Sequence, residues 1–219
     1  MDDAVNIRGL KRYAADHCGL VPPPECCEPT GKTIAIIGGG PSGLSAAYYL
    51  QQMGHQCTVF EHRKELGGML YYGIPNYRLP KERLAEDVQN ILATGVETKM
   101  NTCIGDGDGE ISFKMLKENY DAVYISIGAH TDKKLGIPGE DAKGVISAIQ
   151  MLRDIGDGNP PDFTGKNVIV VGGGNVAMDA TRSAIRLGAK NVSVMYRRRK
   201  ADMTALMDEI EAAIAEGAE

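Results

Sequence analysis

Gly38, Gly40 and Gly43 stand at G-x-G-x-x-G spacing between the β-branched run 33–37 and an alanine- and leucine-rich segment. Glycines at this spacing let the chain turn sharply, let a diphosphate approach the backbone, and let the following helix pack close to the strand. The N-terminus of that helix would then face the phosphates with free N–H groups and the positive end of its dipole. The loop therefore predicts a phosphate-binding turn.

A carboxylate completes this first pattern. Glu61 closes the next apolar run, CTVFE, 18 residues beyond Gly43. An acidic residue at this distance accepts hydrogen bonds from the two hydroxyls of an adenosine ribose. Strand, loop, helix and acid together favour a dinucleotide site over a glycine turn with a purely structural role.

The same pattern returns about 134 residues later. Gly172 and Gly174 open a second loop, and Ala177 takes its third position. Aligned on the glycines that end the two helices, with one residue inserted, Tyr196 falls where Glu61 stands in the first copy, and the basic run 197–200 (RRRK) follows it. Guanidinium groups pair bidentately with phosphate oxygens, which a carboxylate would repel. The second loop therefore predicts NADP(H), and the first a different dinucleotide, FAD. A solvated basic turn is the alternative interpretation of the run.

Apolar periodicity and glycine or proline stops predict the elements that position these loops. Helices are expected over 4–17, after the first loop as far as Gly54, over 81–95 and over 205–217. Extended chain is expected over 96–104 and a buried strand over 121–128, before a turn-rich connection. The prediction is an α/β fold with two Rossmann-like dinucleotide-binding units, the second incomplete. We divide the chain into an N-terminal helix and proline-rich leader (1–30), an FAD-binding domain (31–135), a connection (136–165) and a partial NADP-binding domain (166–219).

Composition narrows the class of protein. The 219 residues carry 24 basic and 29 acidic side chains, a net charge of −5, which argues against a nucleic-acid or anionic-membrane surface. No apolar run approaches the roughly 20 residues that span a bilayer. Five cysteines, an odd number, are expected to be reduced thiols in a cytoplasmic protein. The four histidines are dispersed, so no metal site is predicted.

Beyond the loops, several longer stretches carry a family resemblance: IAIIGGGPSGLSAAYYL, GGMLYYGIPNYRLPK, YISIGA, GIPGED, and VVGGGNVAMDATRSAIRLGA followed by YRRR. Together they resemble the glutamate synthase small-subunit family of FAD/NADPH oxidoreductases, which includes the NADPH-binding large subunit of NADH-dependent ferredoxin:NADP oxidoreductase. The resemblance covers roughly residues 4–217, and the GGML to RLPK stretch is its most specific part.

The resemblance implies a role for each matching residue. Around FAD it implies contacts to the diphosphate by Gly38, Gly40, Ser42 and Gly43, and to the adenosine ribose by Glu61. It implies that the flavin lies near Gly68, Met69, Arg78 and Gly128, and that the adenine lies near the backbone at Ile104. Around NADP(H) it implies contacts to the diphosphate and the 2′-phosphate by Gly172, Gly174, Asn175, Val176, Arg197 and Arg198. Hydride transfer from nicotinamide to flavin needs no acid or base from the protein, so no catalytic residue is predicted.

The sequence also departs from the family. Members usually begin with a domain that holds two 4Fe-4S clusters and continue past the second unit to a return segment; neither is present here. Cys18, Cys26 and Cys27 lack the C-x₂-C-x₂-C spacing of a ferredoxin-type cluster. We therefore expect a hetero-oligomer in which NADPH and iron-sulfur or ferredoxin-type partners exchange electrons, with the clusters on partner chains or in missing sequence and with electron bifurcation as one option. A degenerate FAD-binding scaffold or a fragment of a glutamate synthase small subunit are the alternatives.

Overall fold

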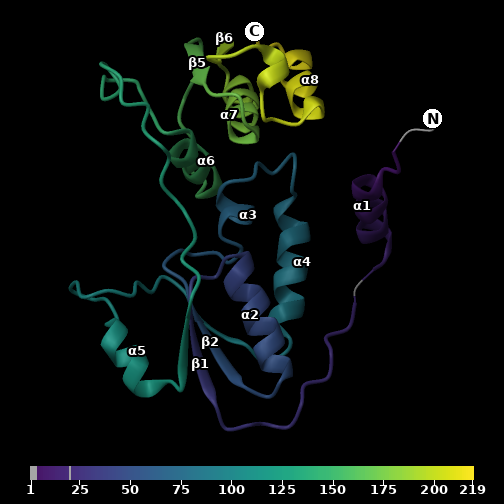
Figure 1. The fold of residues 1–219 in the computed structure, drawn as a ribbon, viewed down its shortest axis with the longest axis vertical. Coiled ribbons are helices and arrows are strands. Elements are labelled where there is room, and N and C mark those ends of the chain that lie inside the picture. Colours follow the sequence, from purple (N-terminus) through teal and green to yellow (C-terminus); the bar gives the residue numbers. More distant parts are fainter. Residues whose placement is uncertain (1–3, 20) are drawn as a thin grey trace.

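The structure, a computed structural model, describes residues 4–19 and 21–219. Its described helices are α1 (Ile7–His17), α2 (Pro41–Gln52), α3 (Met69–Tyr72), α4 (Lys81–Leu92), α5 (Phe113–Asn119), α6 (Ala148–Gly156), α7 (Asn175–Arg186) and α8 (Met207–Ala215). Its described strands are β1 (Thr33–Ile37), β2 (Gln56–Phe60), β3 (Glu97–Lys99), β4 (Ala122–Ile125), β5 (Asn167–Val171) and β6 (Asn191–Met195). Figure 1 shows two α/β units one above the other, with α6 between them.

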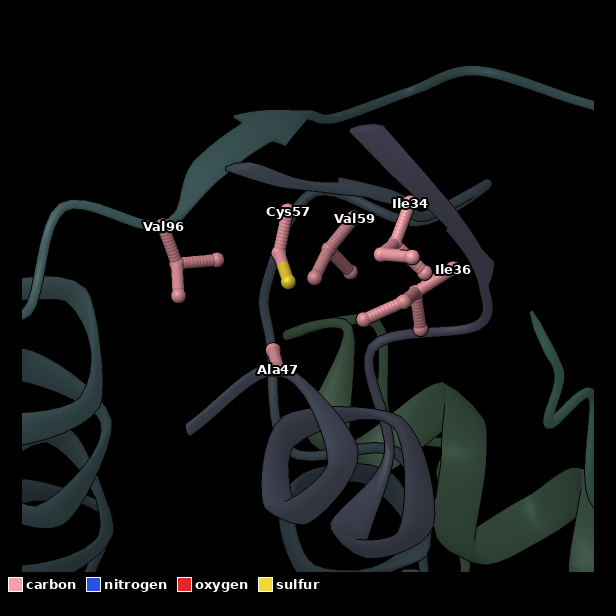
Figure 2. Packing of buried hydrophobic residues seen from close by; sticks show 6 residues of the cluster. All are labelled: Ile34, Ile36, Ala47, Cys57, Val59 and Val96. Atoms are coloured by element: carbon pink, nitrogen blue, oxygen red, sulfur yellow. The ribbon is translucent and has the colours of Figure 1, made fainter. Parts of the chain in front are cut away.

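The first unit is built on a parallel sheet of order β3-β2-β1-β4. The β-branched run of β1 lies at its centre, and side chains from β1 and β2 pack against α2 and the start of β3. Figure 2 shows this core, formed by Ile34, Ile36, Ala47, Cys57, Val59 and Val96. Each large apolar side chain buried in this way stabilises the fold by about 1.5–3 kcal/mol. The sheet thereby fixes the first glycine loop at the carboxyl end of β1.

Glycine and proline set the ends of α2. Gly40 occupies the N-cap position with extended backbone, and Pro41 follows in the first turn, where a missing N–H costs nothing. Gly54, with φ +84°, ends the helix as predicted, and a Cβ there would lie 2.2 Å from the carbonyl oxygen of Glu28. The leader segment therefore passes so close to the helix end that only glycine fits.

The second unit repeats the strand, loop, helix and strand of the first, as predicted. Strands β5 and β6 pair in parallel from Asn167–Asn191 to Val171–Met195, and α7 joins them. Helix α8 packs on α7 through an apolar cluster that contains Met178 and Ile210. The last residue, Glu219, exchanges backbone hydrogen bonds with Val192 and Val194 of β6.

The helices and strands differ from the sequence predictions at two places. The connection 136–165 contains α6, whose Met151 and Leu152 pack on α7; Ser147 caps it by accepting a hydrogen bond from the Gln150 N–H. This helix has nine residues and lies between glycine- and proline-rich runs, so its apolar periodicity is too short to predict a helix from the sequence. The strand predicted as buried, β4, is largely exposed, because β1 is its sole neighbour in the described sheet.

The predicted N-terminal helix is present as α1, which Asn6 caps through a hydrogen bond from the Gly9 N–H. None of its residues is buried, and Figure 1 shows it to one side of the first unit. Among the described residues, no helix is long and apolar enough to cross a membrane.

We expect Cys57 to be the slowest of the five thiols to react with a soluble alkylating reagent. Its side chain is fully buried beneath α2, and burial raises the pKa of the thiol to about 11, so little thiolate forms at neutral pH. Cys18, Cys26, Cys27 and Cys103 are exposed. Mass spectrometry after a brief iodoacetamide pulse should find Cys57 unmodified until denaturant is added. Modification of Cys57 at the rate of Cys103 would contradict this packing.

Candidate functional site

A cavity of about 520 Å³ opens at the carboxyl ends of β1, β2 and β4, beside the start of α2. This is where ligands bind in open parallel sheets, since the strand order changes direction there. Eight residues singled out from the sequence line it: Gly38, Gly40, Ser42, Glu61, Gly68, Met69, Ile104 and Gly128. Residues far apart in the sequence are thus brought together around one space.

The glycines of the first loop are required for two different reasons. A Cβ on Gly38 would lie 2.4 Å from the carbonyl oxygen of Ser126, and one on Gly43 would lie 2.0 Å from that of Gly38. The fold itself excludes side chains at both positions. At Gly40 the backbone is ordinary, with φ −81°, and a Cβ would meet nothing nearer than the Cα of Gly68 at 3.7 Å. The protein does not need glycine at this position, whereas a group filling the cavity would.

Gly68 closes the loop from the opposite side. Its φ is +54°, and a Cβ there would lie 2.7 Å from the Cα of Gly40, so the two glycine backbones are in direct contact. Met69 begins α3 immediately afterwards. The Ser42 hydroxyl, in the first turn of α2, is hydrogen-bonded to the Tyr124 hydroxyl of β4 at 2.9 Å. On the side of the glycine loop, the cavity therefore presents backbone and small side chains to whatever fills it.

Glu61 is buried at the carboxyl end of β2, with a side chain 7% exposed. Its Oε2 accepts a hydrogen bond from the Gly39 N–H at 2.8 Å, and its Oε1 accepts one from the Arg63 N–H at 2.9 Å. The His62 Nδ1 lies 3.0 Å from the same Oε1. Carboxylate oxygens have further lone pairs for ligand hydroxyls. Glu61 thus holds the glycine loop and faces the cavity at the same time.

Replacing Glu61 by alanine should destabilise the cofactor-free protein by about 1–3 kcal/mol, because the buried Gly39 N–H would lose its acceptor. Glu61→Gln should cost less, since its amide oxygen still accepts that bond. Glu65, which is exposed four residues later, supplies the matched control Glu65→Ala. Urea unfolding of the three variants measures the difference. Equal stability of Glu61→Ala and the control would show that the carboxylate does not hold the loop.

Three basic residues in the cavity wall were not predicted from the sequence: His62, Arg63 and His130. The Arg63 guanidinium lies over the Tyr72 ring at 4.7 Å and pairs with Asp157 at 3.0 Å. Burial, followed by the charges of Arg153 and Arg63, lowers the pKa of His130. No motif in the sequence around Arg63 or His130 predicts a binding role. The fold brings the two residues to the same cavity wall.

Arg78, expected near the flavin, is not among the residues that line the cavity. Its Nη1 donates to both carboxylate oxygens of Asp179 on α7, at 2.9 and 2.8 Å, and its Nε lies 3.1 Å from the Glu209 Oε1. Burial raises the pKa of Asp179 although Arg78 opposes this effect. The structure therefore places Arg78 in the contact between the two units.

The second loop has the geometry of the first. The Gly172 N–H donates to the Met195 carbonyl at 3.0 Å, just as the Gly38 N–H donates to the Phe60 carbonyl at 2.8 Å. A Cβ on Gly174 would meet nothing nearer than the Thr204 Oγ1 at 3.5 Å. As at Gly40, the protein does not need this glycine, and an approaching ligand would.

Tyr196 occupies the position of Glu61 in the first unit. A Cβ on the middle glycine, Gly173, would lie 2.7 Å from the Tyr196 ring, and the Tyr196 hydroxyl donates to the Asp202 carbonyl at 3.1 Å. Arg199 pairs with the Asp202 carboxylate. The second unit thus has an aromatic ring where the first has a buried carboxylate.

The next two arginines and the first turn of α7 complete this loop. Arg197 and Arg198 are exposed and form no ion pair with any residue that the structure describes. Asn175 accepts a hydrogen bond from the Leu206 N–H, and the Val176 side chain is exposed beside it. The loop offers cationic groups at its outer end and no carboxylate in the position of Glu61.

Two glycine loops, each leading from a parallel strand into a helix, define a Rossmann-like protein with two dinucleotide-type units. The family model for pyridine nucleotide-disulphide oxidoreductase matches residues 32–219. The chain belongs to the pyridine nucleotide-disulphide oxidoreductase family. The predicted fold class and the predicted resemblance to glutamate synthase small chains are both confirmed.

Relatives agree with this assignment, and a solved structure agrees with the fold. The chain is 41% identical over 243 aligned positions to the NADP(+)-dependent formate dehydrogenase subunit beta of Moorella thermoacetica, covering 99% of this chain and 34% of the relative. It is 35% identical to the glutamate synthase (NADPH) small chain of Escherichia coli, covering 99% and 48%. The fold matches Mycobacterium tuberculosis FprA in complex with NADPH at a TM-score of 0.71 and 23% identity, covering 85% and 48%. The chain spans about a third to a half of the length of these proteins.

Proposed function

We propose that the chain binds FAD in the cavity of the first unit and NADPH at the second loop, and that it acts as an NADPH-dependent flavin oxidoreductase. When bound, these groups supply hydride transfer between nicotinamide and flavin, which needs no acid or base from the protein. The chain's own residues bind the two nucleotides, orient them and exclude water. The observation that carries the proposal is the cavity that gathers eight of the residues predicted for FAD.

The first cavity fits FAD. Gly40 leaves room for a diphosphate beside the first turn of α2, where N–H groups of a helix start lack partners within the helix. The Glu61 carboxylate can accept hydrogen bonds from the ribose hydroxyls, and Ile104 lines the same cavity. Gly68 and Met69 would border the flavin.

The second loop fits NADPH better than NADH. Tyr196 replaces the carboxylate that would repel a 2′-phosphate, and Arg197 and Arg198 are available to bind it. Gly174 leaves room for the diphosphate beside Asn175 and Val176 at the start of α7. The difference between the two units at one equivalent position supports two different nucleotides.

We further propose that iron-sulfur or ferredoxin-type proteins exchange electrons with the flavin in a hetero-oligomer. Two relatives are named as beta subunits, of an NADP(+)-dependent formate dehydrogenase and of an NADPH-Fe(3+) oxidoreductase, which supports a role within an assembly. The five cysteines are free thiols, which fits a reducing compartment such as the cytoplasm.

Spectroscopy of the protein purified with its natural partners tests this proposal. We expect a flavin absorbance spectrum and reduction of an artificial dye by NADPH. A preparation with neither would contradict the proposal. Tight FAD binding without reduction by NADPH, with the partners present, would instead indicate a scaffold subunit that has lost turnover.

A further inference from the structure

The two units contact one another directly through charged and polar side chains. Tyr77 and Arg78 lie between α3 and α4 of the first unit, whereas Asp179 and Glu209 lie on α7 and α8 of the second. Arg78 binds both carboxylates, at 2.8 Å to Asp179 and 3.1 Å to Glu209. We call these four residues the ionic latch. Its central pair joins positions that are 101 residues apart in the chain.

Tyr77 inserts beneath two arginines of α7. The Arg182 and Arg186 guanidinium carbons lie 4.4 and 4.2 Å from its ring centroid, within the range of cation–π attraction. The Tyr77 hydroxyl donates to the Asp179 carbonyl at 3.4 Å. Burial raises the pKa of Tyr77 to about 12, so the hydroxyl keeps its proton at neutral pH. One aromatic ring of the first unit is thus held by the same helix that Arg78 binds.

The charges around the latch balance. Arg182 pairs with Glu209 at 3.0 Å, and both Arg182 and Arg186 pair with Glu216 at 2.8 Å. Glu209 therefore keeps a cationic partner when Arg78 is removed. Asp179, 6% exposed, has Arg78 as its one cationic partner among the described residues. A buried charge without a partner is costly, so Asp179 favours the arrangement of the units in which Arg78 reaches it.

Apolar packing does not fix the units against one another directly. None of the buried apolar clusters in the described part of the chain joins side chains of 31–135 with side chains of 166–219. Helix α6 bridges them, packing on α7 through Leu152 and on α3 through Gly156, where a Cβ would lie 3.1 Å from the Tyr72 Cα. Polar contacts between domains commonly permit relative motion. The ionic latch is a direct contact between the two units that opposes such motion.

We propose that Arg78, with Tyr77, is a positioning residue that holds α7, and with it the second glycine loop, in a fixed orientation toward the first unit. Asp179 is the fifth residue of the helix that begins at this loop, so the latch acts within two turns of the predicted diphosphate site. The consequence for hydride transfer rests on the proposed function. The arrangement of the units does not, because the contacts that define it join side chains of this chain alone.

Distances between spectroscopic probes on the two units test the latch in the cofactor-free chain. Probes at exposed Lys114 on α5 and Glu211 on α8, measured by pulsed electron paramagnetic resonance, should give one narrow distance distribution in the wild type. Arg78→Ala and Asp179→Asn should broaden it toward longer separations. Arg83→Ala, which removes an exposed pair with Glu86 on α4, is the matched control and should leave it unchanged. Arg78→Lys should restore part of the narrow distribution, because a lysine reaches Asp179 as a point charge without the guanidinium fork.

Kinetics of the flavin-loaded protein give the second readout. We expect Arg78→Ala to lower kcat for dye reduction by NADPH by up to about 100-fold, since a displacement of about 1 Å can cost that much. The Kd for NADPH should be unchanged, because Arg197 and Arg198 are untouched.

Wild-type distance distributions in both Arg78→Ala and Asp179→Asn would overturn the latch, and changed distances with unchanged kcat would overturn the positioning role. If Arg78→Ala does not fold, Asp179→Asn and Arg78→Lys decide by the same measures. A wild-type protein that binds no FAD would contradict the proposed function and leave the distance result standing.

Discussion

Replacing Arg197 and Arg198 together by alanine should weaken NADPH binding at least about 100-fold and leave NADH binding unchanged. Each charge-assisted hydrogen bond to a phosphate contributes about 1.5–3 kcal/mol, and 1.4 kcal/mol corresponds to a factor of ten. Both side chains are exposed and without ion pairs in the described structure, so their loss should not disturb the fold. Isothermal titration with the two nucleotides measures the effect.

The neighbouring Arg199 provides the control for this result. It pairs with Asp202 at 3.1 Å and caps a short helical turn, so Arg199→Ala should affect NADPH binding less than the double replacement. Equal losses of NADPH and NADH affinity in the double variant would refute a 2′-phosphate site. So would an unchanged affinity for NADPH.

Gly40→Ala should abolish most FAD binding while the cofactor-free protein stays folded. The new methyl group would have ordinary contact with Gly68 at 3.7 Å, so we expect the free energy of unfolding to change by less than about 1 kcal/mol. The same methyl group would occupy the space that the diphosphate needs. Overpacking of this kind costs about 1–3 kcal/mol, which lowers affinity about 5- to 150-fold.

Gly43→Ala separates a fold effect from a ligand effect. Its Cβ would lie 2.0 Å from the Gly38 carbonyl oxygen, so this variant should be destabilised even without FAD. Thermal unfolding without cofactor and flavin fluorescence titration with cofactor distinguish the two cases. Normal FAD affinity in Gly40→Ala would mean that the diphosphate does not lie against this loop.

The two nucleotide units could be predicted because their signals are local. Strand, glycine loop and helix follow one another within about 20 residues, and the helix-ending glycines Gly54 and Gly188, with one inserted residue, give the alignment that pairs Glu61 with Tyr196. The structure shows the same correspondence in space, since each of these two side chains lies against the middle glycine of its loop.

Features that depend on long-range contact could not be predicted. The resemblance predicts a contact between Arg78 and the flavin, and nothing within its neighbourhood in sequence reveals a partner on α7. The exposure of β4 depends on which strands flank it, which the apolar run 122–125 does not encode. Residues 63 and 130 meet at the cavity wall for the same reason: tertiary packing brings together positions that carry no common pattern.

Anaerobic titration of the flavin-containing protein, purified with its partners, tests the central claim most directly. Stepwise addition of NADPH should bleach the flavin absorbance and consume at least one NADPH per flavin, because one hydride reduces one flavin and iron-sulfur partners would take up further electrons, and NADH should act only at much higher concentration. Equal reduction by the two nucleotides would contradict the assignment of NADPH to the second loop. A flavin that NADPH leaves oxidised would contradict the proposed oxidoreductase function.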